Sequence, residues 1–170
     1  DVLSAIDFAK KKPYVKNISI FGTSFGGVCA LLAASRYKKI KSLGLKAPAS
    51  DMGYNRKQKL GDEGYKEWKK IGIAEFTNND GKKVMLKYSF MEDAENIDAF
   101  EEAKNILCPT LIVHGDKDLS VPLEQSKKLE KSINGVKLEI IAGANHHFDR
   151  SGEKERVNSR FVDFFKEVLK

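Results

Sequence analysis

The sequence contains no apolar run long enough to cross a membrane. No stretch reaches about 18 consecutive apolar residues, which is the length that a transmembrane helix needs. Cysteine is also scarce: Cys29 and Cys108 are the only two, and they lack the paired spacing that zinc sites use. We therefore expect no membrane span and no bound metal, and we expect the chain to work without a cofactor.

The first residues lack the pattern of a secretory signal. In DVLSAIDFAKKK the lysines follow the apolar residues, whereas a signal peptide places its positive charges first. This order favours a cytoplasmic protein. The sequence begins with Asp1 instead of methionine, so it leaves open whether a leader lies further upstream.

A strong excess of one charge is absent as well. The chain has 30 Lys and Arg residues against 24 Asp and Glu residues, which gives a net charge of +6. The lysines are spread along the chain, without the dense basic stripe and interleaved aromatic residues that are typical of nucleic-acid binding. We expect no nucleic-acid partner, and nothing in the sequence indicates an oligomeric state.

Helix-like and strand-like segments alternate along most of the 170 residues, a length of about one domain. The spacing of apolar residues predicts strands over residues 17–21, 40–50, 109–115 and 136–143. It predicts helices over residues 2–11, 25–37, 123–133 and 153–169. This alternation predicts an α/β fold, with a mostly parallel sheet that is covered by helices on both faces.

Residues 51–105 interrupt the alternation. The segment is rich in lysine and contains IAEFTNNDGKKVMLKYSF, in which two strand-like runs flank a polar turn with glycine, so we expect a β-hairpin there. It is too long for a plain connection, which predicts an insertion over the sheet edge within a single domain of residues 1–170. Tyr54, Tyr65 and Trp68 are candidates either for lining an acyl pocket or for packing the insertion against itself.

The stretch GTSFGG, residues 22–27, places a serine among small residues where the first predicted strand ends and a helix begins. A strand that turns sharply into a helix holds Ser24 on a strained elbow, and the residues two positions away on either side must be small to avoid collision. The helix N-terminus directs backbone N–H groups at a reacting carbonyl, so the N–H of Phe25 is a candidate oxyanion donor. The alternative is a glycine-rich turn without any chemistry.

A serine nucleophile needs a base, and the sequence contains only three histidines. His114 lies at the end of the predicted strand 109–115, while His146 and His147 follow the predicted strand 136–143. In open α/β sheets, ligands bind at the carboxyl ends of the strands. All three histidines are therefore predicted to lie on the same rim of the sheet as Ser24.

The base in turn needs a carboxylate on its other ring nitrogen. Asp116 and Asp118 follow the strand 109–115 and are the candidates. The order Ser24, Asp118, His146 is the order in which α/β-hydrolase triads occur along the chain.

Three motifs together resemble the α/β-hydrolase superfamily. FGTSFGG resembles its nucleophile elbow, which implies that Ser24 is the nucleophile. HGDKDLSVP resembles its acid loop, in which the second aspartate is the triad acid, here Asp118. GANHHF resembles its Gly-x-x-His-x-Phe loop, in which the first of the two histidines is the base, here His146. The resemblance implies that residues 51–105 occupy the place of the family's variable lid.

The neighbours of these residues have simpler interpretations. We interpret Asp116 as a turn or capping residue, and we expect His147 to point away from the site. We expect His114 to pack or to form hydrogen bonds at the end of its strand. No residue can be assigned to substrate binding from the sequence.

The resemblance implies a serine hydrolase that cleaves carboxylic esters through an acyl-enzyme, with a small-molecule ester or peptide as its substrate. An aminopeptidase or oligopeptidase-like peptidase would use the same three residues and is the first alternative. A thioesterase or a lipase-like enzyme also stays open. A non-catalytic module that keeps the fold is the alternative from another class.

The chain also departs from the superfamily pattern. It resembles only the C-terminal two-thirds of an α/β-hydrolase, because the earlier strands and the loop with the second oxyanion donor have no counterpart in its sequence. We therefore expect that this chain is part of a longer hydrolase, and that the strand before Ser24 lacks a partner on one side.

Overall fold

The computed structural model describes residues 1–77 and 81–170, which divide into two compact units. The first unit comprises Asp1–Ser50 and Ala99–Lys170, and the second comprises Asp51–Asp98. The second unit begins where the sequence predicts an insertion. Residues 99–105, which the prediction included in that insertion, belong to the first unit instead. That the second unit serves as a lid stays a prediction.

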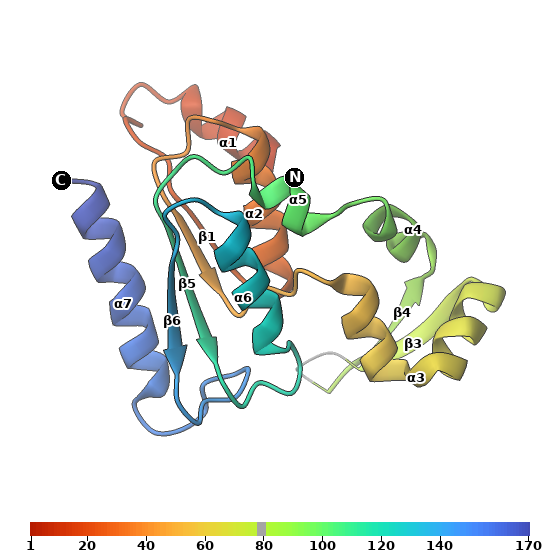
Figure 1. The fold of residues 1–170 in the computed structure, drawn as a ribbon. Helices are drawn as coiled ribbons and strands as arrows, with labels where there is room; N and C mark the ends of the chain where they lie inside the picture. Colours follow the sequence, from red (N-terminus) through yellow and green to blue (C-terminus); the bar gives the residue numbers. More distant parts are fainter. Residues whose placement is uncertain (78–80) are drawn as a thin grey trace. The chain divides into compact units, whose positions relative to one another are not determined.

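A sheet of parallel strands forms the centre of the first unit (Figure 1). Its strands are β1 (Ile20–Thr23), β2 (Leu43–Lys46), β5 (Thr110–Gly115) and β6 (Lys137–Ile141). They lie in the order β1-β2-β5-β6, and each neighbouring pair is parallel. Because the strands run the same way, their carboxyl ends meet at one rim, where the loops after β1, β5 and β6 begin.

Helices cover both faces of this sheet. They are α1 (Val2–Lys10), α2 (Phe25–Arg36), α5 (Ala99–Ala103), α6 (Leu123–Ser132) and α7 (Glu153–Val168). In Figure 1, α7 lies on one side of the strands, and α2 and α6 lie on the other. This arrangement confirms the predicted α/β fold with a parallel sheet between two layers of helices.

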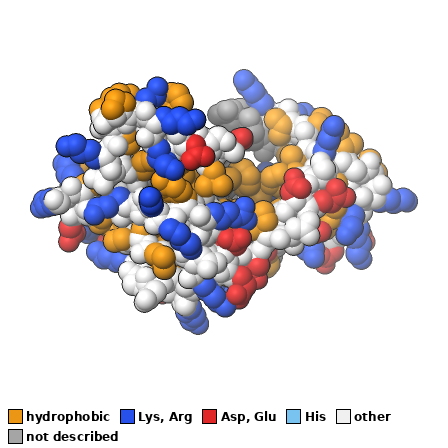
Figure 2. All heavy atoms as spheres, turned by 90° about the horizontal axis from the view of Figure 1, so that it is seen from above, with side chains coloured by type: hydrophobic (Ala, Val, Ile, Leu, Met, Phe, Trp, Pro, Cys, Tyr) orange, Lys and Arg blue, Asp and Glu red, His pale blue; other side chains and the backbone are white. Residues whose placement is uncertain are grey.

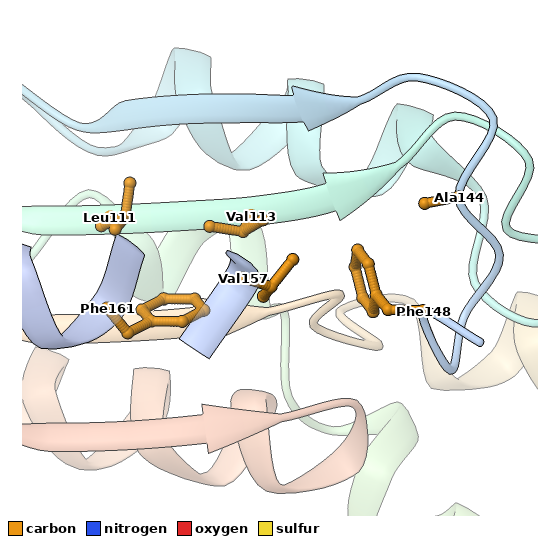
Figure 3. Packing of buried hydrophobic residues seen from close by; sticks show 6 residues of the cluster. All are labelled: Leu111, Val113, Ala144, Phe148, Val157 and Phe161. Atoms are coloured by element: carbon orange, nitrogen blue, oxygen red, sulfur yellow. The ribbon is translucent and has the colours of Figure 1, made fainter. Parts of the chain in front are cut away.

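Strand β5 shows how the sheet divides its residues between the two layers. Every residue of β5 is buried, as a strand between two neighbours and two helix layers requires. Leu111 and Val113 pack with Phe161 of α7 in one apolar cluster (Figure 3). Because side chains alternate along a strand, His114 points to the other face. There its ring contacts Ser126 of α6.

Two strands are shorter or displaced relative to their predicted ranges. The strand predicted over residues 17–21 is β1 (Ile20–Thr23), and only Leu43–Lys46 of the range 40–50 forms β2. The register explains both differences, since Ile20 to Thr23 pair one to one with Leu43 to Lys46. Backbone pairing between strands therefore outweighs the local apolar pattern in setting the ends of these elements.

The second unit has a core of its own. It contains α3 (Met52–Ile71), β3 (Ile73–Thr77), β4 (Lys83–Lys87) and α4 (Ser89–Glu95). Strands β3 and β4 are antiparallel, which confirms the predicted hairpin, while part of its predicted turn lies outside the described residues. Tyr65 and Trp68 pack in an aromatic cluster with Phe76, Tyr88 and Met91. Both side chains are therefore buried in packing within this unit, whereas Tyr54 is exposed.

Charged side chains are distributed over the surface. On the face drawn in Figure 2, Lys and Arg side chains stand among acidic and uncharged groups and do not gather in a single patch. Within residues 1–77 and 81–170, no helix has the length and apolarity that crossing a membrane would require.

Candidate active site

Ser24 lies between β1 and α2 in an uncommon backbone conformation. Its φ of 52° and ψ of −122° let the chain reverse direction between the last residue of the strand and the first residue of the helix. The Ser24 N–H donates to the carbonyl oxygen of Lys46 at 2.9 Å, and the Ser24 carbonyl accepts from Ala49 at 3.1 Å. The neighbouring strand β2 and the loop after it thus hold the serine in a conformation that non-glycine residues rarely adopt.

The two glycines that flank Ser24 have different reasons to be small. A Cβ atom at Gly22 would overlap the carbonyl group of Gly26 and approach the Cβ of Ala30 at 2.8 Å. A Cβ atom at Gly26 would meet no other part of the chain within 4 Å. The expectation that both positions must be small is therefore confirmed for Gly22 and wrong for Gly26, because Gly22 is the residue that the helix backbone approaches.

Asp118 is held in the loop that follows β5. Its Oδ1 accepts hydrogen bonds from the backbone N–H groups of Ser120 and Val121, at 2.9 and 2.8 Å. The residue is only 8% exposed. These two bonds fix the plane of the carboxylate and leave Oδ2 directed at two histidine rings, those of His114 and His146.

His146 connects this carboxylate to the serine. Its Nδ1 lies 2.6 Å from Oδ2 of Asp118, and its Nε2 lies 3.1 Å from Oγ of Ser24. The three side chains come from the loops after β5 and β6 and from the end of β1. The structure thus brings together the serine, histidine and aspartate that the sequence motifs single out, in the hydrogen-bonded order that nucleophilic catalysis needs.

Hydrogen bonds connect the loop that carries the base to the loop that carries the acid. Oδ1 of Asp116 accepts from the N–H of Gly143 at 2.6 Å, and the N–H of Lys117 donates to the carbonyl of Ala144 at 3.0 Å. A Cβ atom at Gly115 would overlap that same carbonyl. Asp116 therefore caps the neighbouring loop, which agrees with its interpretation as a capping residue.

The rest of the base loop is anchored in the core. Ala144 and Phe148 are fully buried, and both belong to the apolar cluster between the sheet and α7, in which Phe148 lies beside Val157 (Figure 3). Phe148 adopts a φ of 55°, which is uncommon for a residue other than glycine. Ala144 and Phe148, two residues before and after His146, thus anchor this part of the loop in the core, and hydrogen bonds hold the His146 ring.

The other two histidines occupy different surroundings. His147 is exposed, and its ring lies edge-on to His146 at 5.4 Å between centroids. His114 is completely buried and forms hydrogen bonds at the end of its strand, as expected from the sequence. Its partner Ser126 was not predicted from the sequence. Ser126 lies on α6 three residues before Leu129, and both are buried, so Ser126 is a polar residue on the apolar face of this helix.

The electrostatics of the site favour an ionised Asp118. Burial by itself would raise the pKa of this carboxyl group. The hydrogen bonds from His114, His146 and the N–H of Val121 outweigh burial and hold the pKa of Asp118 well below its usual value. At neutral pH a negative charge therefore faces Nδ1 of His146. Among the described residues, no group of three or more His, Cys, Asp or Glu side chains is placed to hold a metal ion.

Comparison with known sequences gives a consistent set of relatives. A sequence model of the prolyl oligopeptidase family matches residues 1–170. Serine hydrolase BPHL of Mus musculus is 25% identical over 190 residues, which cover 99% of this chain and 58% of that protein. Human palmitoyl-protein thioesterase ABHD10, mitochondrial, is 28% identical over 157 residues, which cover 91% of this chain and 50% of the relative. The chain thus spans little more than half the length of these curated relatives.

Solved structures with the same fold are also found. Est1E from Butyrivibrio proteoclasticus superposes with a TM-score of 0.78 at 29% identity, over 99% of this chain and 68% of that one. Mouse alpha/beta hydrolase domain-containing protein 10 superposes with a TM-score of 0.69 at 21% identity, over 96% of this chain and 68% of that one, and shows likeness of fold. The resemblance to α/β-hydrolases is therefore confirmed.

Proposed function

The chain belongs to the prolyl oligopeptidase family, and from this premise we propose that it is a serine hydrolase with Ser24, His146 and Asp118 as its catalytic triad. The observation that carries the proposal is the continuous pair of contacts on the His146 ring, 3.1 Å to Oγ of Ser24 and 2.6 Å to Oδ2 of Asp118. A turn that only connected a strand to a helix would have no need of this alignment.

The first half of the reaction forms an acyl-enzyme. Asp118 accepts the hydrogen bond from Nδ1–H of His146, so the lone pair on Nε2 faces the hydroxyl of Ser24. Nε2 takes the hydroxyl proton as Oγ attacks the carbonyl carbon of the substrate. The ring then gives that proton to the leaving alcohol or amine, and the bond from the carbonyl carbon to the leaving group breaks.

The second half restores the enzyme. A water molecule enters beside the acyl group, and Nε2 of His146 removes one of its protons as the water oxygen attacks the acyl carbon. The proton returns to Oγ of Ser24 when the acyl bond breaks, and the carboxylic acid leaves. No cofactor is needed, because every proton in the cycle passes through Nε2.

The N-terminus of α2 is the proposed site of oxyanion stabilisation. Ser24 is the N-cap of this helix and Phe25 is its first residue. A backbone N–H at this position points out of the helix end, where the helix dipole favours negative charge. We assign the N–H of Phe25 as one oxyanion donor. Loss of a single such donor typically costs about 10²- to 10³-fold in rate.

Esters are the substrate class that we favour, and the proposed leaving group is an alcohol. Est1E, at 29% identity, has also been solved with ferulic acid bound, which supports testing a feruloyl ester. A peptide substrate is the second candidate, and the match to a family named for prolyl oligopeptidase favours it. A thioester is a third, because the ABHD10 relative is a palmitoyl-protein thioesterase.

The first experiment measures whether the triad is assembled. The chain is treated with a fluorophosphonate, and its intact mass and tryptic peptides are analysed. We expect a single adduct on Ser24, no adduct in Ser24→Ala, and labelling at least 10³-fold slower in His146→Ala, since a serine without its base is a weak nucleophile. Equal labelling of the wild type and His146→Ala would contradict the proposal and favour a non-catalytic module.

A substrate panel then separates the candidates. Methyl ferulate and short p-nitrophenyl esters represent esters, a palmitoyl thioester represents thioesters, and aminoacyl and prolyl anilides represent peptides. Each activity is compared with that of Ser24→Ala, which removes the nucleophile and leaves the backbone of the elbow unchanged. The substrate class is the one that the wild type cleaves with the largest kcat/KM and that Ser24→Ala does not cleave.

A further inference from the structure

We propose that His114 and Ser126 form a buried pair that positions the carboxylate of Asp118 for His146. This inference rests on the proposed function, since it concerns a residue of the proposed triad. Neither His114 nor Ser126 would touch a substrate, because both side chains are completely buried. Both are therefore positioning residues that act through Asp118.

The His114 ring makes contacts through both of its nitrogens. Nδ1 lies 2.6 Å from Oγ of Ser126 on α6. Nε2 lies 2.9 Å from the carbonyl oxygen of Val121 and 3.2 Å from Oδ2 of Asp118. The ring thus spans the space between helix α6 and the acid loop, directly behind the carboxylate.

The chemistry of these partners decides which ring nitrogen carries the proton. A backbone carbonyl and an ionised carboxylate can only accept, so Nε2 must donate to them. In the neutral ring, Nδ1 then accepts, and the hydroxyl of Ser126 is the donor that faces it. Ser126 thereby holds His114 in the tautomer that supports Asp118.

Two histidines consequently share one oxygen of Asp118. Oδ2 accepts from Nδ1 of His146 at 2.6 Å and faces Nε2 of His114 at 3.2 Å. The His114 donor fixes the position of Oδ2 and disperses part of its negative charge. With less charge on this oxygen, Asp118 stabilises a protonated His146 ring less strongly.

Other charged groups lie near this network. Asp118 and His146 belong to it, and His147 stands beside His146 on the same loop. Glu124 lies in the first turn of α6, and its pKa is held below the usual value, mainly by a backbone hydrogen bond and by Lys127. Glu124 is exposed, so its effect on the buried ring is screened by solvent.

The test is an NMR titration of the histidine rings in the full 170-residue chain. The chain has only three histidines, so His146 can be assigned by the signal that disappears in His146→Gln. His114→Leu removes the donor to Oδ2, and we expect the midpoint of the His146 titration to rise by about 0.5 to 1 pH unit. Ser126→Ala removes the hydroxyl that selects the tautomer of His114, and we expect a smaller rise of the same midpoint.

Two further variants separate positioning from packing. His114→Gln keeps an N–H near the position of Nε2 and should bring the midpoint back toward that of the wild type. Ser42→Ala is the matched control, because Ser42 is equally buried and its hydroxyl is bonded to Ser19 at 2.7 Å, at the start of β2. It should lower stability without moving the titration.

The outcomes are distinct. If the midpoint is unchanged, within about 0.2 pH unit, in folded Ser126→Ala and His114→Leu, the proposal is overturned; if His114→Leu does not fold, Ser126→Ala decides. The fluorophosphonate reaction should show the same shift on the acid side of its pH profile. Because ring titration needs no turnover, a shifted midpoint in a chain that never reacts at Ser24 would reject the proposed function and keep this inference.

Discussion

At the scale of single residues, the site depends on groups whose hydrogen bonds are completed by backbone atoms. Oδ1 of Asp118 takes two backbone N–H groups, and Oδ1 of Asp116 takes one. Asn145 similarly accepts from the N–H groups of His147 and Asp149. Bonds of this kind do not depend on further mobile side chains, so they orient the carboxylate and the imidazole with little remaining freedom.

The low pKa of Asp118 leads to a prediction about stability in acid. A group whose pKa is lowered by folding stabilises the folded state above its unfolded pKa, about 3.9 for Asp, and loses this contribution as the pH falls toward its folded pKa. We expect the free energy of unfolding to fall more between pH 7 and pH 3 in the wild type than in Asp118→Asn. Urea unfolding, followed by circular dichroism at several pH values, measures the difference.

The control for this prediction is Asp163→Asn, which changes an exposed carboxylate of α7. It should show the same pH dependence as the wild type. If Asp118→Asn also follows the wild-type curve, the carboxylate of Asp118 is not stabilised by its hydrogen bonds in the way described above.

At the scale of elements, the junction of β1 and α2 is the critical piece of local structure. The strand must pass close beneath the first turn of the helix, and Gly22 is the residue that permits this approach. In Gly22→Ala the new methyl group would overlap backbone atoms, which cannot rotate away. We expect a loss of about 1–3 kcal/mol in the free energy of unfolding, measured in urea, together with slower labelling of Ser24.

Gly26→Ala is the matched variant within the same motif. Its methyl group would meet no other part of the chain within 4 Å, and alanine restricts the unfolded chain more than glycine does. The free energy of unfolding should stay equal or rise by about 0.4–1 kcal/mol. Equal destabilisation by the two substitutions would mean that the elbow is sensitive to any added side chain and that the steric argument for Gly22 is wrong.

At the scale of the whole molecule, the two units have separate cores. The first unit buries apolar residues on both faces of its sheet, whereas the second depends on one cluster around Trp68, whose indole N–H donates to the carbonyl of Leu86 at 2.9 Å. Small units bury a lower share of their surface and are correspondingly less stable. We infer that Asp51–Asp98 unfolds more readily than the rest of the chain.

A single tryptophan makes this inference measurable. Trp68 is the only one in the sequence, so fluorescence excited at the tryptophan band reports on the second unit, while circular dichroism reports on all helices. We expect the fluorescence transition at a lower urea concentration than the transition seen by circular dichroism. Coincident transitions would show that the two units unfold together.

The alternation of strands and helices was readable because apolar periodicity is a local property of the chain. Helix α3 was not predicted, because Met52–Ile71 is rich in charged residues and its apolar residues are few. Its aromatic side chains Tyr65 and Trp68 are buried by β3, β4 and α4, which lie later in the sequence. Contacts between distant segments therefore decided what the local pattern could not.

The sequence by itself determined the α/β fold and the identity of the candidate triad, because Ser24, Asp118 and His146 each lie in a short motif at the end of a strand. Only the tertiary structure decided how these residues meet, since the hydrogen bonds that align them join loops far apart in the chain. It alone brought Ser126 to His114, placed the steric constraint on Gly22 and separated the second unit from the first. A sequence motif shows which side chains are present, whereas the distances between them and their burial depend on the assembly of the whole sheet.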